Sequence, residues 1–154
     1  MLMFPDQWRG DWVPQSRGAT DDGASIPLRL PFITSLMNEG TWFTNAYSAA
    51  PVCAPSRGAL VTGREYDEAG TPCNFCGNVP TDLPNMFQAL SKDPEAKYHT
   101  MTTGKDDLTK TTQPGPNGDT NAAALGFTDW IRYSGKDDVI SSWPVPHEPY
   151  GYWL

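Results

Sequence analysis

Features that would place a chain directly in a structural class are scarce in this sequence of 154 residues. Three cysteines are too few for a disulfide-built scaffold, and no apolar run approaches the roughly 20 residues that a bilayer-spanning helix needs. Eighteen acidic residues outnumber eleven basic ones, so the net charge is −7. This charge argues against binding to nucleic acid or to an anionic membrane surface. No signal-peptide pattern is recognisable, and the cellular compartment stays open.

Proline and glycine are abundant instead, with fifteen and fourteen residues respectively. They predict many turns and irregular segments. The chain is nevertheless 38% hydrophobic and contains six residues each of Trp, Tyr and Phe, which is enough to form a core. We therefore expect one loop-rich globular domain, because 154 residues are close to the usual size of a single domain.

The apolar patterns along the chain predict strands that alternate with helices. Short runs rich in β-forming residues predict strands at residues 1–4, 41–47 and 98–103. Apolar residues at helical spacing, or a proline at a helix start, predict helices at residues 30–37, 55–61 and 83–90. Residues 111–122 show no period and are expected to be loop. Alternation of this kind predicts an α/β fold with a mainly parallel sheet.

The most informative stretch lies where the second of these helices begins. Cys53-Ala54-Pro55-Ser56-Arg57 is followed, after four residues, by Thr62-Gly63-Arg64. Cys, Pro, Ser, Arg and the final Thr-Gly-Arg would coincide by chance on the order of once per billion positions at average residue usage. The stretch resembles the signature of the sulfatase family, Cys-x-Pro-Ser-Arg with a later Thr-Gly-Arg.

The resemblance implies a specific nucleophile. A separate formylglycine-generating enzyme would oxidise Cys53 to formylglycine, whose hydrated aldehyde attacks the sulfur of a sulfate ester and later releases sulfate. Arg57 would point its donors toward that diol or toward the sulfate oxygens. The residue types agree with this role, because a nucleophile beside a helix N-terminus lies in a positive field that suits an anionic substrate.

The segment from Phe4 to Asp11 resembles a second part of the family. Its Asp-Gln form is similar to that of phosphonate monoester hydrolases and choline sulfatase-like members. The resemblance implies that Asp6, together with the formylglycine made from Cys53, binds Ca²⁺ or another divalent cation such as Mn²⁺ or Mg²⁺. It implies that Gln7 is an active-site neighbour.

The segment from Thr103 to Leu108 resembles the family's Gly-Lys-x-His segment, whose lysine binds the sulfate. The resemblance implies that Lys105 contacts the substrate, and the alternative is a solvated loop lysine. Asp107 stands where the family has a histidine. A carboxylate therefore replaces a side chain that can donate a hydrogen bond.

Cys73-Asn74-Phe75-Cys76 is a single Cys-x-x-Cys pair. A structural zinc ion needs four ligands, and the chain contains only two histidines, at unsuitable spacing. We expect two unrelated loop cysteines, and a local disulfide is the alternative.

The resemblance covers residues 1–108, and residues 109–154 are expected to be a loop-rich continuation. The family's later pair of metal ligands, Asp-Asn or Asp-His, is missing. We therefore expect a partial alkaline-phosphatase-like α/β/α sandwich, the N-terminal part of a metal-dependent sulfatase, inactive as this chain alone. The substrate would be a sulfated small molecule or carbohydrate. The alternatives are a phosphonate or phosphate ester hydrolase of the same superfamily, and a non-catalytic remnant that acts as a binding module.

Overall fold

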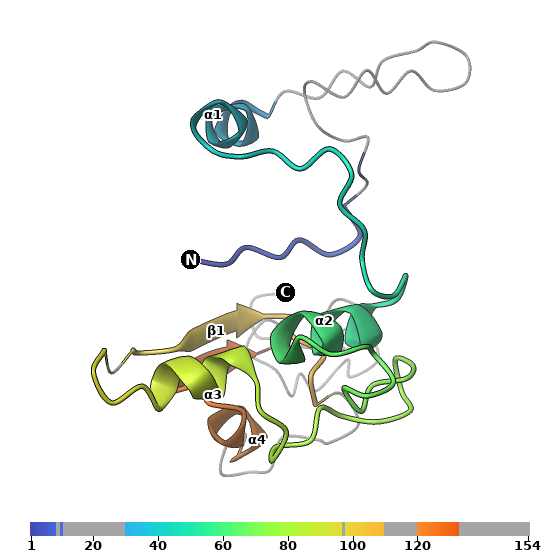
Figure 1. Cartoon of the computed structure of the whole chain (residues 1–154), viewed down its shortest axis with the longest axis vertical. Helices are drawn as coiled ribbons and strands as arrows, with labels where there is room; N and C mark the ends of the chain where they lie inside the picture. The colour runs from blue at the N-terminus through green and yellow to red at the C-terminus, as the bar shows by residue number, and fades with distance from the viewer. Residues whose placement is uncertain (9, 11–29, 97, 110–119, 133–154) are drawn as a thin grey trace, which may run out of the picture. The chain divides into compact units, whose positions relative to one another are not determined.

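The computed structural model describes residues 1–8, 10, 30–96, 98–109 and 120–132. These residues belong to two compact units, Met1–Tyr47 and Ser48–Leu154. Within the described residues, the first unit contains helix α1, and the second contains helices α2, α3 and α4 and strands β1 and β2 (Figure 1).

The first unit contains α1, Pro31–Glu39. Pro31 occupies the first helical position, where its missing N–H would have no partner within the helix. The amide of Gly40 donates to the carbonyl oxygen of Leu36 at 2.9 Å and ends the helix. The helix predicted at residues 30–37 is confirmed.

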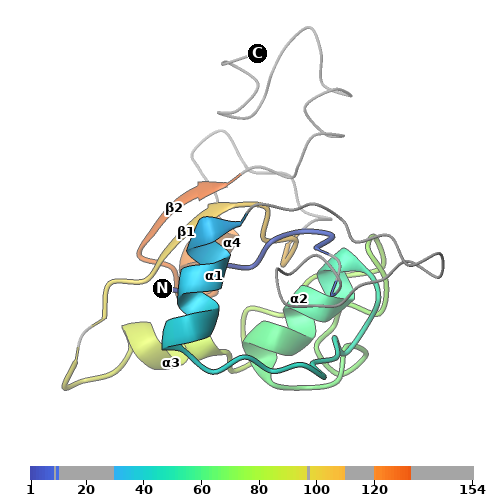
Figure 2. The same ribbon diagram turned by 90° about the horizontal axis from the view of Figure 1, so that it is seen from above.

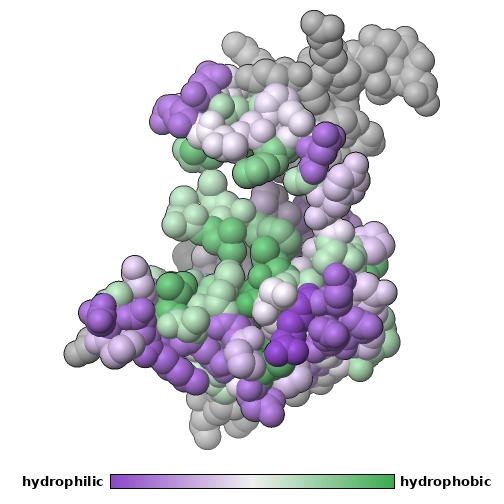
Figure 3. All heavy atoms as spheres, viewed as in Figure 1, coloured by the Kyte–Doolittle hydropathy of each residue, from purple (hydrophilic) through white to green (hydrophobic). Residues whose placement is uncertain are grey.

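The two strands predicted in the first unit are wrong. Residues 1–4 and 41–47 have no strand structure, and every residue in both segments is exposed. Their exposed hydrophobic side chains include Met1, Phe4 and Phe43. Figure 3 colours hydrophobic residues green on the face that it shows. A strand needs a hydrogen-bonding neighbour, and β-propensity in a local sequence does not supply one.

The second unit begins its regular structure with α2, Cys53–Thr62. The helix predicted at residues 55–61 is confirmed and starts two residues earlier, at Cys53 itself. It ends at Gly63, which has a positive φ of 67°, a conformation that glycine adopts without steric cost. The sequence predicts a strand-to-helix junction at Cys53, and only the helical side of that junction forms.

Two short helices follow. α3, Met86–Ser91, is capped by Asn85, whose side chain accepts hydrogen bonds from the amides of Phe87 and Gln88 at 3.0 and 3.1 Å. It confirms the later half of the helix predicted at residues 83–90. α4, Thr120–Ala124, lies partly where the sequence predicts loop, so that prediction is wrong for residues 120–122. Residues 111–119 lie outside the described part.

Among the described residues of the second unit, two parallel strands form a sheet. β1, Met101–Gly104, pairs with β2, Asp129–Arg132, and the register sets Met101 opposite Asp129. Figure 2 shows the two strands side by side. The parallel α/β arrangement is confirmed, and β1 confirms the end of the strand predicted at residues 98–103. The sequence reasoning missed β2, because four residues are too few to show a period.

A small hydrophobic core joins these elements. Its buried members come from α2, α4 and the loops around them, and they are Val61, Val79, Leu108, Ala122, Leu125 and Phe127. The rings of Phe87 in α3 and Phe127 pack with centroids 4.4 Å apart. The core holds α2 in place relative to the loop that follows β1, because Val61 and Leu108 are both part of it.

The loop between α2 and α3 contains a disulfide between Cys73 and Cys76. The expectation of two unrelated cysteines is therefore wrong, and the alternative of a local disulfide is correct. A turn brings the two Cα atoms to 5.1 Å, which is within the range that a disulfide spans. None of the helices in the described part is long and apolar enough to cross a bilayer.

Candidate active site

Cys53 is the first residue of α2. The first turn of a helix carries amide groups without helical partners, and these create a positive potential at that end. The thiol is half-buried and takes no part in a disulfide. The helix thus presents Cys53 at the end of α2 that favours negative charge.

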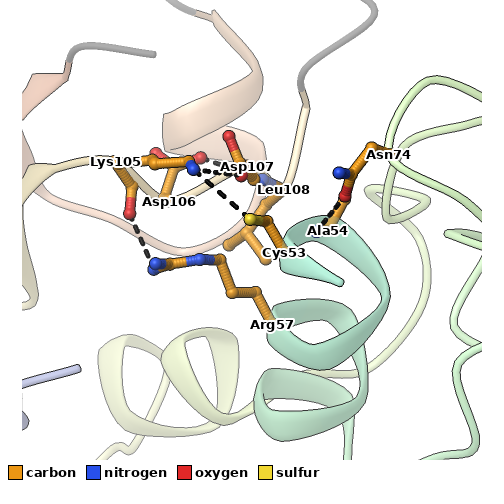
Figure 4. Close-up of polar contacts among 8 residues, drawn as sticks. All are labelled: Cys53, Ala54, Arg57, Asn74, Lys105, Asp106, Asp107 and Leu108. Carbon is orange, nitrogen blue, oxygen red and sulfur yellow. Dashed lines mark hydrogen bonds and ion pairs between the residues drawn. The ribbon is translucent and has the colours of Figure 1, made fainter. Parts of the chain in front are cut away.

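The first turn of α2 receives its cap from a distant residue. The preceding residue, Val52, gives no side-chain hydrogen bond, and Pro55 has no amide hydrogen. The amide of Ala54 instead donates to Oδ1 of Asn74 at 3.0 Å (Figure 4). The sequence reasoning missed this contact, because Asn74 is 20 residues away. The available signal was a good capping residue inside the Cys-x-x-Cys pair.

Lys105 meets Cys53 from the other side. It follows β1, and its Nζ donates to the Sγ of Cys53 at 3.3 Å (Figure 4). The same ammonium lies 3.6 Å from Oδ2 of Asp107, and the side chains of Lys105 and Asp107 are 20% and 1% exposed. The structure thus brings together two residues that are 52 positions apart in the sequence. It places Lys105 in a half-buried pair rather than in open solvent.

Arg57 lies one turn after Cys53 in α2 and is buried, with 7% of its surface exposed. Its Nη1 donates to the carbonyl oxygen of Lys105 at 2.8 Å (Figure 4). The guanidinium therefore fastens the loop after β1 to α2. The role implied by the family resemblance, contact with the diol or with sulfate oxygens, stays a prediction.

The backbone after β1 turns sharply where it carries these side chains. Gly104 and Asp107 have positive φ angles of 92° and 54°. The Oδ1 of Asp106 accepts from the amide of Leu108 at 3.0 Å and stabilises this turn. Asp107 tolerates the left-handed conformation better than most residues do. The turn directs Lys105 toward α2 and places Asp107 next to it.

Two further contacts keep α2 in place around Cys53. The hydroxyls of Ser48 and Ser56 lie 2.6 Å apart, and the Ser48 hydroxyl also donates to the carbonyl oxygen of Ala50. On another face of α2, a side chain at Gly58 would collide with the buried Thr71. The turns around α2 thus require a small residue at position 58.

The other predicted site residues, Asp6 and Gln7, belong to the first unit. Both are exposed, and Gln7 has a positive φ of 56°. Cys53 belongs to the second unit. The roles of Asp6 as metal ligand and of Gln7 as active-site neighbour stay predictions.

The described residues do not by themselves make a metal site. Among them there is no group of three or more His, Cys, Asp or Glu side chains that could hold a metal ion. Ca²⁺ usually takes six to eight oxygen ligands. The surroundings of Cys53 do fit an oxygen-bearing side chain at that position, since Lys105 already offers a charged donor to its terminal atom.

A cysteine at a helix N-terminus with an ammonium donor on its sulfur lies in a positive potential that suits an anion. Comparison with known proteins gives the family. The family model described as Sulfatase matches residues 15–152, so the chain belongs to the sulfatase family, whose general activity is sulfuric ester hydrolysis.

Several curated proteins are similar to this chain. A multifunctional alkaline phosphatase superfamily protein, PehA, from Trinickia caryophylli is 31% identical over 108 residues, which are 67% of this chain and 20% of that protein. Arylsulfatase K from Homo sapiens is 47% identical over 82 residues, 53% of this chain and 15% of the relative. An ulvan-active sulfatase from Formosa agariphila is 37% identical over 64 residues, 42% of this chain and 11% of the relative.

The chain therefore spans a fifth or less of the length of these relatives. Among solved structures, one described as the crystal structure of Ps i-CgsB is 31% identical, with a TM-score of 0.45. The match covers 60% of this chain and 20% of that one.

Proposed function

We propose that this chain supplies the nucleophile segment of an enzyme that hydrolyses sulfate esters of small molecules or carbohydrates. The nucleophile would arise from Cys53 by conversion to formylglycine. The observation that carries the proposal is the 3.3 Å contact between Lys105 Nζ and Cys53 Sγ at the N-terminus of α2. Membership of the sulfatase family and the signature around Cys53 support it.

Each residue around position 53 has a distinct part in this proposal. Formylglycine, made by a formylglycine-generating enzyme, would supply a hydrated aldehyde as an oxygen nucleophile. Lys105 binds the anionic oxygens of the ester, and the N-terminus of α2 adds to the positive potential there. Asp107 keeps the ammonium of Lys105 directed at position 53, because the two charges lie 3.6 Å apart.

Arg57 acts in this proposal by holding Lys105. Its hydrogen bond to the Lys105 carbonyl oxygen fixes the backbone from which the ammonium reaches Cys53. A guanidinium suits this task, since its planar group of donors loses little freedom on binding. The contact with the diol or with the sulfate that the family resemblance implies for Arg57 is part of the same proposal.

The proposal also includes a divalent cation. Its ligands would include Asp6, with Gln7 nearby. Ca²⁺, Mn²⁺ and Mg²⁺ all prefer oxygen ligands, and such an ion would help to neutralise the anionic ester. The described residues do not complete such a site. The remaining ligands would come from residues outside the described part of the chain or from other parts of the enzyme.

Mass spectrometry tests the nucleophile. In protein isolated from the native host, we expect the peptide that contains Cys53 to carry the mass of the aldehyde in place of the thiol. A Cys53→Ala variant, expressed in the same host within the full enzyme, is the control and should not turn over an aryl sulfate. A native peptide that contains only unmodified thiol would overturn the formylglycine proposal.

A second candidate function is hydrolysis of phosphonate or phosphate esters. The relative from Trinickia caryophylli, with its multifunctional alkaline phosphatase superfamily name, and the Asp-Gln pair at residues 6 and 7 both favour it. The anions are similar, so the same lysine and nucleophile would serve both. Assays of the full enzyme with an aryl sulfate and a phenyl phosphonate monoester distinguish them, and a large preference for the phosphonate would replace our first assignment.

A further inference from the structure

The cap of α2 and the disulfide lie in one loop. Asn74, whose Oδ1 accepts from the amide of Ala54 at 3.0 Å, stands between Cys73 and Cys76, which are bonded to each other. Ala54 is fully buried and directly follows Cys53. The disulfide thus closes the short turn that carries the capping group of the helix on which Cys53 lies.

The rest of this loop is fastened to α2 and to itself. Thr71 packs against Gly58 of α2 so closely that a side chain at position 58 would collide with it. Gly77 approaches the backbone of Gly70 so closely that it could carry no side chain without a shift. The residues on both sides of the Cys73–Cys76 turn are therefore held in place. The turn itself is closed by the disulfide and by a hydrogen bond from the Cys76 amide to the Cys73 carbonyl oxygen at 3.5 Å.

We propose that the Cys73–Cys76 disulfide holds Asn74 as a positioning residue for the first turn of α2, so that the redox state of this pair controls the order of the turn that carries Cys53. The helix has no side-chain cap from Val52, its neighbour in sequence, so Asn74 is the group that satisfies the amide of Ala54. This inference does not depend on the enzymatic activity proposed above.

A dithiol reagent would break the Cys73–Cys76 disulfide. A dithiol transfers two electrons and two protons to the Cys73–Cys76 bond, which breaks into two thiols, while the reagent becomes a cyclic disulfide. Cys76 is exposed and can be attacked by such a reagent. After reduction the turn regains rotational freedom, and Asn74 no longer stays on the amide of Ala54.

Hydrogen exchange of single backbone amides in the full chain tests the inference. Reduction with dithiothreitol should accelerate exchange of the Ala54 amide roughly fivefold, the usual effect of losing a helix cap. The Gly63 amide, which bonds to Ala59 at the other end of α2, is the internal reference and should not change. Equal rates at Ala54 in both states would overturn the proposal. Equal acceleration at Ala54 and Gly63 would overturn it too, because the disulfide would then stabilise the whole unit.

Variants of Asn74 provide the matched comparison. Asn74→Leu keeps the approximate shape but removes the acceptor, and it should expose the Ala54 amide in the oxidised protein as reduction does. Asn74→Asp retains an acceptor oxygen and should keep the protection. If the Leu variant protects Ala54 as well as the native Asn74 does, or if the Asp variant fails to protect it, Asn74 is not the capping group.

The reaction of Cys53 with iodoacetamide reports on the thiol itself. Protein made without the formylglycine-generating enzyme keeps a thiol at position 53. In its oxidised form and in the double variant Cys73→Ser/Cys76→Ser, Cys53 is the one thiol of the sequence, so the two rates compare directly. We expect the double variant to react several-fold faster, since its first turn opens more often. The same rate in both proteins would show that the disulfide does not act on Cys53.

Discussion

Lys105 connects three groups through one side chain and its own backbone. Its ammonium touches Cys53 and Asp107, and its carbonyl oxygen accepts from Arg57. A cation held in this way is suited to an anionic ester at position 53. In the proposed function, the chemistry of the site thus depends on a residue that the helix carrying Cys53 does not contain.

Replacing Lys105 tests that dependence. In the full enzyme, Lys105→Met should lower kcat/KM for an aryl sulfate by roughly a hundredfold or more, because it removes a charged donor from the anion. Steady-state kinetics measure the effect. Lys92→Met, at an exposed lysine after α3, is the control and should change little. A Lys105→Met enzyme within twofold of the native rate would make Lys105 a structural residue.

Arg57 gives a prediction about stability. Arg57→Lys keeps the charge but loses the planar group that reaches the Lys105 carbonyl oxygen, and the site is buried. We expect a loss of about 1–3 kcal/mol in the free energy of unfolding, the usual cost of a broken buried hydrogen bond. Urea denaturation measures it, with Arg64→Lys at an exposed position as the comparison. Equal stability of the two variants would show that the Arg57 bond contributes nothing.

At the scale of elements, α2 carries Cys53 and is held from several sides. Its cap comes from the disulfide loop, its Ser56 hydroxyl meets Ser48, and its last turn enters the core through Val61. Most of these partners lie far from α2 in the sequence. Neighbouring residues determine where the helix starts, whereas contacts with the surrounding loops fix its position.

Gly58 offers a test of that packing. Gly58→Ala raises helix propensity, which alone would stabilise α2. The new Cβ would nevertheless collide with the Oγ1 of Thr71, so we expect a net loss of about 1–3 kcal/mol in thermal unfolding experiments.

The double variant Gly58→Ala/Thr71→Ala should recover part of this loss, because it removes the colliding oxygen. Thr71→Ala alone should cost little, since that buried hydroxyl has no hydrogen-bond partner among the described residues. A stabilised Gly58→Ala protein would show that the loop moves away from α2 without cost.

At the scale of the whole molecule, the chain is a small part of what its relatives contain. It spans a fifth or less of their length, and its described residues have no group of three metal-binding side chains. The family match therefore describes only the segment that this chain represents. Catalysis by the whole enzyme would also need a complete set of metal ligands.

We predict that the 154-residue chain alone has no measurable sulfatase activity, even with Cys53 fully converted. Without further ligands a cation is not held where it would stabilise the developing charge, a loss on the order of a thousandfold in rate or more. The measurement is turnover of an aryl sulfate, with the full enzyme as the positive control. Calorimetric titration should show only weak Ca²⁺ binding. Micromolar binding that Asp6→Ala abolishes, together with turnover, would contradict the prediction.

The local sequence was enough to identify the signature around Cys53 and to predict the helices α1 and α2 and the parallel character of the fold, although the predicted start of α2 was two residues too late. These features depend on neighbouring residues: proline at a helix start, glycine at its end and apolar residues at helical spacing. The charge balance likewise needed no structure to argue against a nucleic-acid surface.

Only the tertiary structure decided which β-prone segments become strands and what surrounds Cys53. Residues 41–47 have the composition of a strand and remain unpaired within the described part, while the short β2 pairs with β1. The contacts of Cys53 and Ala54 with Lys105 and Asn74 join residues 52 and 20 positions apart. Strand pairing and side-chain contacts of this kind depend on distant parts of the chain that meet only after folding, so no local pattern specifies them.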